Sequence, residues 1–152
     1  SVPGRFEEII YRKKTSKIII DYAHTPEAIK SLLKTYSNNK FKPSIVFGCG
    51  GERDKGKRKK MAVVAKKYAK KVYITDDNPR NENPATIRKT IKKYCPKGIE
   101  ISDRRKAIRT AIERIDEKDI LIIAGKGHEK FQIIKNKKIE FEDYKIAKSF
   151  IK

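Results

Sequence analysis

The sequence predicts a single α/β domain over residues 1–152, and three observations support this fold class. Short apolar runs of strand length recur along the chain. Each run is followed by a stretch whose apolar residues are spaced as on a helix, and this alternation is typical of a parallel sheet covered on both faces. Segments rich in glycine and polar residues follow the strands, where such sheets bind their ligands. The predicted fold is therefore Rossmann-like, with a mostly parallel sheet and helices on both faces.

The first half of the chain predicts a βαβαβ unit. Pro26 stands near the first turn of the first helix, where Thr25 can act as N-cap. In order, the expected elements are strand Ile18–Ile20, a helix from Pro26 to about Ser37, strand Ser44–Phe47, loop Gly48–Gly56, a helix that includes Met61–Ala69, and strand Val72–Thr75.

The second half continues the alternation and then changes character. In order, the expected elements are loop Asp77–Pro84, helix Ala85–Tyr94, short strand Ile99–Ile101, helix Arg104–Ile115, buried strand Ile120–Ala124 and a final helix Asp143–Ile151. Between the last two, Phe131–Lys135 and Lys138–Phe141 flank Asn136-Lys137 like the arms of a hairpin. We expect this hairpin to supply an antiparallel strand at an edge of the sheet.

Charge and cysteine content limit the binding partners and the cellular compartment to be expected for the protein. The 39 Lys and Arg residues against 19 Asp and Glu give a formal charge of +20. This charge attracts polyanions but does not choose among nucleic acid, nucleotides and anionic lipid, and lysine on helical stretches is also typical of a solvated face. Cys49 and Cys95 show no disulfide or metal spacing, and no apolar run suits a membrane span or a signal peptide. We expect a soluble cytoplasmic protein.

Four polar segments follow predicted strands: Asp21–Pro26, Gly48–Gly56, Asp76–Arg80 and Gly125–Glu129. Because ligands of open α/β sheets bind beyond the carboxyl ends of the strands, we expect these segments to form one site. The Gly48 loop does not continue as GxGxxG into a helix, and no GxxxxGK[ST] occurs. The chain therefore lacks its own cradle for nucleotide phosphates, and activation of ATP would need another domain.

The charged residues of these segments favour a zwitterionic ligand. Arg53 and Arg80 offer planar forks for carboxylate or phosphate. Asp77, Asn78 and Glu129 bring acceptors that can pair with an ammonium group. An amino acid fits this combination better than a plain polyanion does.

The order of the motifs adds a resemblance to a known family. DYAHTP, VFGCGGERDKGKR, ITDDNPR, DR followed by AI, and AGKGHE resemble, in order, the C-terminal domain of the tripeptide-forming Mur ligases of peptidoglycan synthesis, over essentially the whole chain. The resemblance implies the third domain of a three-domain enzyme, with Ser1–Gly4 as the end of an interdomain linker. ATP and Mg²⁺ would be bound mainly by the missing central domain, and the UDP-N-acetylmuramoyl-dipeptide by the missing domains. By this resemblance, the isolated domain holds no catalytic residue or metal ligand and cannot ligate.

The resemblance also implies roles for single residues. Arg53 matches the arginine that grips the carboxylate of the incoming amino acid. Arg80, last in Asp-Asn-Pro-Arg, matches the form that selects meso-diaminopimelate over lysine, because it meets a second carboxylate; a close analogue such as lanthionine would satisfy the same contacts. The other implied contacts to the amino acid are Asp77, Asn78, Pro79, Gly125 and Glu129. The residues implied at the nucleotide are Arg5, Asp21, Tyr22 and His24, with Lys126 and His128 as further candidates to line the cleft.

Two other functions stay open at this point. One is a stand-alone basic module for nucleotides or nucleic acid. A single-strand binder, however, needs exposed aromatic residues along its basic groove, whereas Tyr22, Phe47, Tyr73 and Phe131 lie in or beside predicted strands. The other is an amino-acid sensor without catalytic partners, which a complete natural gene beginning near Ser1 would favour. We expect no specific nucleic-acid partner.

Overall fold

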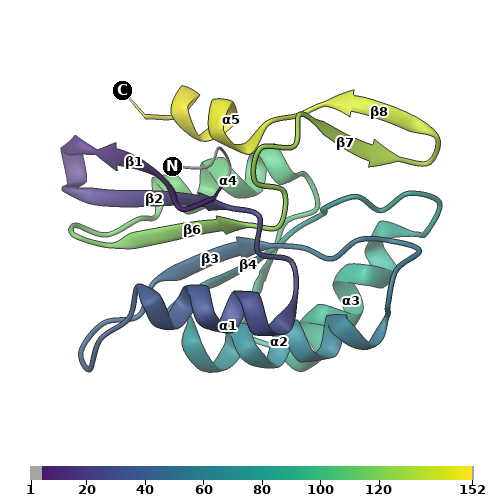
Figure 1. The fold of residues 1–152 in the computed structure, drawn as a ribbon, viewed down its shortest axis with the longest axis horizontal. Helices are drawn as coiled ribbons and strands as arrows, with labels where there is room; N and C mark the ends of the chain where they lie inside the picture. Colours follow the sequence, from purple (N-terminus) through teal and green to yellow (C-terminus); the bar gives the residue numbers. More distant parts are fainter. Residues whose placement is uncertain (1–4, 152) are drawn as a thin grey trace.

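The structure, a computed structural model, describes residues 5–151 and contains the predicted alternation of strands and helices (Figure 1). The predicted linker end, Ser1–Gly4, lies outside the described residues. The elements are β1 (Glu7–Tyr11), η1 (Arg12–Lys14), β2 (Ser16–Asp21), α1 (Pro26–Thr35), β3 (Ser44–Phe47), α2 (Gly56–Tyr68), β4 (Val72–Ile74), α3 (Pro84–Tyr94), β5 (Ile99–Glu100), α4 (Arg104–Glu113), β6 (Ile120–Ala124), β7 (Phe131–Ile134), β8 (Lys137–Glu140) and α5 (Asp143–Ser149).

Six strands form the main sheet in the order β1-β2-β6-β3-β4-β5. All neighbours are parallel except β1, which pairs antiparallel with β2 at one edge. The carboxyl ends of the parallel strands therefore lie along the same side of the sheet. Asp21 at the end of β2 is level with Ala124 at the end of β6, and Gly125 N donates to Asp21 O at 3.1 Å. The polar segments after these strands consequently begin next to each other.

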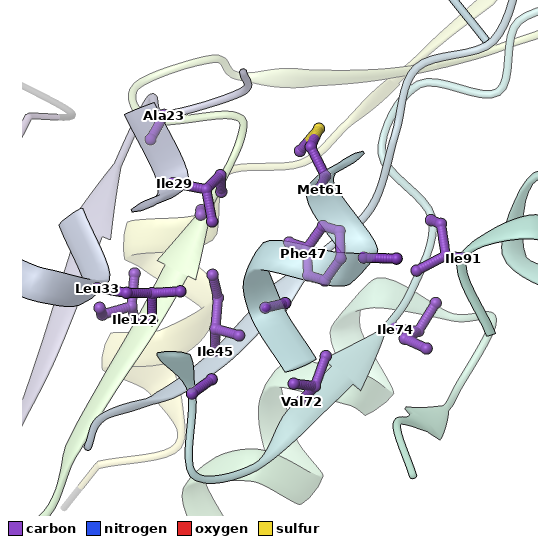
Figure 2. Packing of buried hydrophobic residues seen from close by; sticks show 14 of the residues in the cluster. Ala23, Ile29, Leu33, Ile45, Phe47, Met61, Val72, Ile74, Ile91 and Ile122 are labelled. Carbon is purple, nitrogen blue, oxygen red and sulfur yellow. The ribbon is translucent and has the colours of Figure 1, made fainter. Parts of the chain in front are cut away.

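The central strands are buried on both faces, and their side chains alternate between two hydrophobic clusters. Ile19 of β2 belongs to the cluster beneath α1, α2 and α3, whereas Ile18 and Ile20 belong to the cluster beneath α4 and α5. Phe47 and Met61 pack in the first cluster (Figure 2). The helices thus cover both faces of the sheet, as the sequence predicts.

The helix starts follow the predicted capping chemistry. Thr25 Oγ1 accepts a hydrogen bond from Ala28 N at 3.1 Å, which confirms Thr25 as the N-cap of α1. Asn83 and Asp103 cap α3 and α4 in the same way. Within residues 5–151, no helix combines the length and the apolar character needed to cross a bilayer.

The antiparallel edge strand is present, but it is β1, so the expectation that the hairpin would supply it was wrong. Within β1 only Ile9 is buried, and Ile10 is about half exposed. This segment lacks the apolar pattern by which a strand is recognised in sequence. Its pairing with the backbone of β2 makes it a strand.

The predicted hairpin exists as a separate two-stranded sheet, β7 with β8. Ile134 pairs with Lys137, so the turn residues are Lys135 and Asn136 and not Asn136 and Lys137 as expected. Lys135 adopts a left-handed conformation with φ of 56°. Its N–H donates to Arg80 O, which ties the turn to the segment after β4. The hairpin therefore supports a candidate site segment.

Candidate functional site

A cleft of about 330 Å³ lies at the carboxyl ends of the parallel strands. Segments after β2, β3, β4 and β6 line it together with α2. The lining residues are Tyr22, His24, Gly48, Cys49, Gly50, Arg53, Asp54, Lys57, Met61, Asp77, Asn78, Arg80, Gly125 and Glu129. All the residues predicted to contact an amino acid are among them except Pro79, which is buried and does not line the cleft. The fold therefore brings together residues that are far apart in the sequence.

Two glycines allow the loops around this cleft to approach closely. A Cβ atom on Gly51 would lie 1.9 Å from Pro79 O, and Gly51 N donates to Asn78 O at 2.8 Å. Gly125 has a φ of 113°, and a Cβ there would lie 2.7 Å from Asp77 Oδ2. A side chain at Gly51 would push the two segments apart, whereas at Gly125 it would displace the Asp77 carboxylate and strain a backbone with positive φ.

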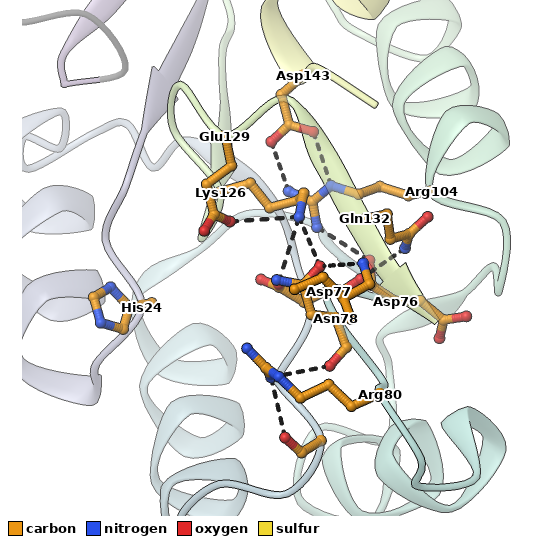
Figure 3. Close-up of polar contacts among 12 residues, drawn as sticks. His24, Asp76, Asp77, Asn78, Arg80, Arg104, Lys126, Glu129, Gln132 and Asp143 are labelled. Carbon is orange, nitrogen blue, oxygen red and sulfur yellow. Dashed lines mark hydrogen bonds and ion pairs between the residues drawn. The ribbon is translucent and has the colours of Figure 1, made fainter. Parts of the chain in front are cut away.

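Arg80 is held in place through both its backbone and its side chain. Its φ is 54°, and its N–H donates to Ile133 O at 3.0 Å. Arg80 Nη1 donates to Gly51 O at 3.1 Å and to Asn78 O at 3.3 Å (Figure 3). Nε and Nη2 donate no hydrogen bond within the described part of the chain. One edge of a fixed guanidinium thus remains available to a carboxylate.

The Asn78 side chain has a defined amide orientation. Its Oδ1 accepts from Ile133 N and from Lys126 Nζ, each at 2.9 Å. Because both neighbours are donors, the oxygen must face them, and Nδ2 carries the free hydrogen-bonding capacity. Asn78 therefore offers donors to the cleft, whereas sequence reasoning expected an acceptor for ammonium. Beside Arg80, such donors favour a carboxylate.

Lys126 and His128, predicted to line the cleft, do not line it. Lys126 is fully buried, and its Nζ lies 3.4 Å from Glu129 Oε1 and 4.0 Å from Asp77 Oδ1. It lies behind the candidate site residues because Gly125 and Gly127, both with positive φ, turn the chain on either side of it. His128 is exposed, with its ring 6.5 Å from that of Tyr22.

Sequence reasoning missed the fully buried ion pair of Arg104 and Asp143. Arg104 donates to both carboxylate oxygens of Asp143, at 2.9 and 2.7 Å. It also donates to Asp76 O at 3.2 Å and to Ala124 O at 3.1 Å (Figure 3). These carbonyls directly precede Asp77 and Gly125, so Arg104 holds together the starts of two site segments. The DR motif was its only signal in the sequence, and nothing there pointed to Asp143.

Cys49 borders the cleft but is not suited to act as a nucleophile. Burial raises the pKa of its thiol to about 12, and the nearby charge of Asp77 acts in the same direction. Its Sγ contacts Met61 Sδ at 3.7 Å. At neutral pH the thiol is protonated, and Cys49 serves as a packing residue.

A second cleft of about 220 Å³ lies beside the first and shares Tyr22 and His24 with it. Arg5 and Asp21 also line this second cleft, so the four residues predicted at the nucleotide lie together. Asp21 is nearly buried, and its two carboxylate oxygens accept from Phe6 N at 2.9 Å and from Ala23 N at 2.8 Å. Asp21 therefore anchors the segment before β1 in addition to facing the cleft.

Neither cleft has the donor set of a metal centre. In residues 5–151, no three or more His, Cys, Asp or Glu side chains gather closely enough to hold a metal ion. The chemistry available to the chain's own residues at the first cleft is the recognition of charged groups. Arginine forks and carboxylates of opposite sign lie there within one lining.

Comparison with known proteins places this geometry in a family. The family model described as Mur ligase, glutamate ligase domain, matches residues 4–127, from before β1 to beyond β6. The chain belongs to the Mur ligase family.

Curated Mur ligase relatives of this chain carry the name UDP-N-acetylmuramoyl-L-alanyl-D-glutamate–2,6-diaminopimelate ligase. The protein from Rickettsia montanensis is 45% identical over 157 residues, which cover 100% of this chain and 32% of the relative. The protein from Anaplasma marginale is 52% identical over 130 residues, covering 84% of this chain and 28% of the relative. This Mur ligase chain thus spans about a third of the length of the curated relatives it matches.

Solved structures agree with the Mur ligase assignment. A UDP-N-acetylmuramoyl-L-alanyl-D-glutamate–2,6-diaminopimelate ligase superimposes with a TM-score of 0.88 at 40% identity, covering 99% of this chain and 32% of that chain. A bifunctional folylpolyglutamate synthase/dihydrofolate synthase from Yersinia pestis has a TM-score of 0.64 at 22% identity, covering 82% of this chain and 29% of that chain. The second similarity shows only that the fold is shared.

One ion pair of this Mur ligase chain makes its stability depend on pH. Arg58 donates to Glu82 at 2.6 and 2.8 Å and to Gly50 O at 3.2 Å, which links α2 to the loops of the cleft. The hydrogen bond from Arg58 lowers the pKa of Glu82 from 4.5 to about 2. A carboxylate whose pKa is lower in the folded than in the unfolded chain stabilises the fold above the unfolded value, and this contribution disappears as pH falls through the folded value.

We therefore expect the free energy of unfolding to decrease as pH falls from about 4.5 to about 2, and to decrease less in Glu82→Gln. Urea unfolding at several pH values in this window measures the difference. Glu113→Gln is the control, because Glu113 is exposed and pairs with Arg109 only at 3.7 Å. Equal pH slopes for the wild type and Glu82→Gln would contradict this prediction.

Proposed function

We propose that this chain is the amino-acid-binding, C-terminal domain of an ATP-dependent ligase. The ligase adds meso-diaminopimelate, or a close analogue, to UDP-N-acetylmuramoyl-L-alanyl-D-glutamate in peptidoglycan synthesis. The observation that carries this proposal is the charge arrangement of the first cleft. Arg53 and Arg80 line it together with Asp77 and Glu129, so one cleft complements both the carboxylates and the ammonium groups of a doubly zwitterionic amino acid.

Each end of such a ligand has suitable partners. Arg53 is exposed at the rim and binds the carboxylate beside the reacting amino group. The free edge of Arg80 and the Nδ2 group of Asn78 bind the carboxylate at the far end. Asp77 and Glu129 pair with the far ammonium group, next to Gly125. L-lysine, which has no far carboxylate, leaves the Arg80 guanidinium unpaired.

The second cleft fits the edge of a nucleotide held mainly by another domain. Arg5 suits a phosphate, and the two oxygens of Asp21 each keep a lone pair for a ribose hydroxyl. The described residues offer neither a P-loop nor a metal-ligand cluster, so we assign the triphosphate and Mg²⁺ to the central domain of the complete ligase. Magnesium, when bound there, neutralises phosphate charge. Both described cysteines are free thiols, which fits action in the reducing cytoplasm.

The role of this domain in the reaction is to position the incoming amino acid. Its cleft holds the amino acid so that the amino group reaches an acyl phosphate formed on the dipeptide precursor, and fixed geometry of this kind accelerates bond formation. The first-cleft chemistry and the family membership do not support a stand-alone nucleic-acid module. We assign the surplus of lysine to solvated surface.

Calorimetric titration of meso-diaminopimelate and, separately, of L-lysine into the chain tests the proposal. At moderate salt, which suppresses nonspecific adhesion, we expect diaminopimelate to bind more tightly than lysine. Arg80→Ala should weaken diaminopimelate binding about 10- to 100-fold, since a hydrogen-bonded charge pair is lost. Arg109→Ala, an exposed change on α4, should have no effect. Equal affinity for the two amino acids would contradict the role of Arg80, and no binding of either would mean that this cleft does not recognise amino acids on its own.

A further inference from the structure

Lys126 lies behind the candidate site and contacts three of its residues. Its side chain is fully buried and lines neither cleft. Removing an ammonium group from water costs several kcal/mol unless partners replace the water. The backbone turns at Gly125 and Gly127, with φ of 113° and 56°, direct this one side chain inward. A buried charge maintained at such cost points to a specific task.

All the polar partners of Lys126 belong to the proposed amino-acid site. Its Nζ donates to Asn78 Oδ1 at 2.9 Å and to Glu129 Oε1 at 3.4 Å, and it lies 4.0 Å from Asp77 Oδ1 (Figure 3). The three partners come from the segments after β4 and β6, which are separated by about 50 residues of sequence. Lys126 therefore joins the two segments at their side chains.

The contact with Asn78 has a directional consequence. An amide oxygen that accepts from two donors cannot turn toward the cleft without losing both bonds. Without Lys126, only Ile133 N would still hold Asn78 Oδ1. The amide could then rotate and present its oxygen to the ligand, and an oxygen repels the carboxylate that the Nδ2 donors attract. The orientation of Asn78 thus depends on Lys126.

We propose that Lys126 is a positioning residue that determines substrate selectivity. It holds the Asn78 donors toward the far carboxylate of the ligand and holds Glu129 beside them. This inference rests on the proposed function, because it concerns the far end of the same amino-acid site. It assigns selectivity jointly to Arg80, which touches the ligand, and to Lys126, which does not.

The test compares the binding of two ligands to the wild-type chain and two variants. Meso-diaminopimelate and L-lysine are titrated into the wild-type chain, Lys126→Met and Lys130→Met. Lys130 is an exposed lysine in the same loop, so its substitution removes one charge and leaves the network intact. Lys126→Gln keeps a hydrogen-bond donor without the charge, so it should retain most of the preference for diaminopimelate, and this expectation can be tested even if the methionine variant does not fold.

The ratio of the two affinities separates positioning from a purely structural role. In Lys126→Met we expect the preference for diaminopimelate over lysine to fall about tenfold, which corresponds to one hydrogen bond to a charged group. In Lys130→Met the preference for diaminopimelate over lysine should be unchanged. A structural role would weaken the binding of both ligands by the same factor. A role limited to charge would lower the preference as much in Lys126→Gln as in Lys126→Met, because both substitutions remove the same charge. Either result would overturn the inference.

Hydrogen exchange gives a measurement that needs no ligand. If Lys126 orients Asn78, the Ile133 amide proton loses its acceptor in Lys126→Met and exchanges faster, relative to the amides of β6. Lys130→Met should leave this rate unchanged. If the wild type binds neither amino acid, the proposed function fails in the isolated chain, while the exchange rate still decides the positioning role. An unchanged rate at Ile133 would overturn it.

Discussion

Replacing Arg104 by alanine is expected to lower the free energy of unfolding by about 3–5 kcal/mol, the range for breaking a buried ion pair by removing one partner. Both side chains of the Arg104–Asp143 pair are fully buried. The variant would leave the Asp143 carboxylate without its cation, and the carbonyls of Asp76 and Ala124 without their donor. Urea or thermal unfolding measures the loss.

Two comparisons separate this effect from the simple removal of an arginine. Arg109→Ala on the same helix breaks only an exposed pair with Glu113, and it should cost less than about 1 kcal/mol. Arg104→Met combined with Asp143→Leu removes both charges and should recover much of the stability, because no buried charge is left unpaired. A loss below about 1 kcal/mol in Arg104→Ala would contradict the central role of the pair.

Gly51→Ala is expected to reduce stability by about 3 kcal/mol, at the upper end of the usual cost of overpacking. The added Cβ would lie 1.9 Å from Pro79 O, which is backbone and cannot rotate away. Relief of this clash must separate the Gly51 and Pro79 segments. The hydrogen bonds from Gly51 N to Asn78 O and from Arg80 Nη1 to Gly51 O would then break. Binding of diaminopimelate should weaken at least about tenfold, because Arg80 loses its support.

Gly56→Ala is the matched control in the same loop. A Cβ on Gly56 meets only a side-chain oxygen of Asp54, at 3.2 Å, and the glycine is exposed at the start of α2. The substitution should change the free energy of unfolding by less than about 1 kcal/mol. Chemical denaturation and calorimetry on both variants provide the measurements. If Gly51→Ala retained wild-type stability and affinity, close packing of the two segments would not be required.

Much of the fold was predictable because its signals are local. The central strands are continuous apolar runs buried on both faces, and the helices have capping residues such as Thr25 at their starts. β1 was not predictable in this way, because the residue types of Glu7–Tyr11 do not alternate between polar and apolar, although their exposure in the structure does. The hairpin turn was misplaced by one residue, and the observed turn contacts Arg80, which is distant in sequence and carries no local signal for the register.

For the candidate site, too, the features with local signals were predictable and those that depend on distant residues were not. The residues that line the first cleft were predictable as a group, since parallel strands bring the segments after them to one side of the sheet. Their orientations were not, because these depend on partners from other segments. Asn78 offers donors because Lys126 and Ile133 bind its oxygen. Lys126 was expected at the surface of the cleft and is fully buried behind it.

The sequence by itself determined the α/β alternation, the four polar segments at the strand ends and the family motifs. Each of these features is a pattern of residues that are neighbours in the sequence. The tertiary structure alone decided which charges are paired and which are free. Arg104 meets Asp143 across 39 positions and Lys126 meets Asn78 across 48. Pairing of buried charges depends on distances and burial that arise only when the strands assemble, so no local pattern could reveal it.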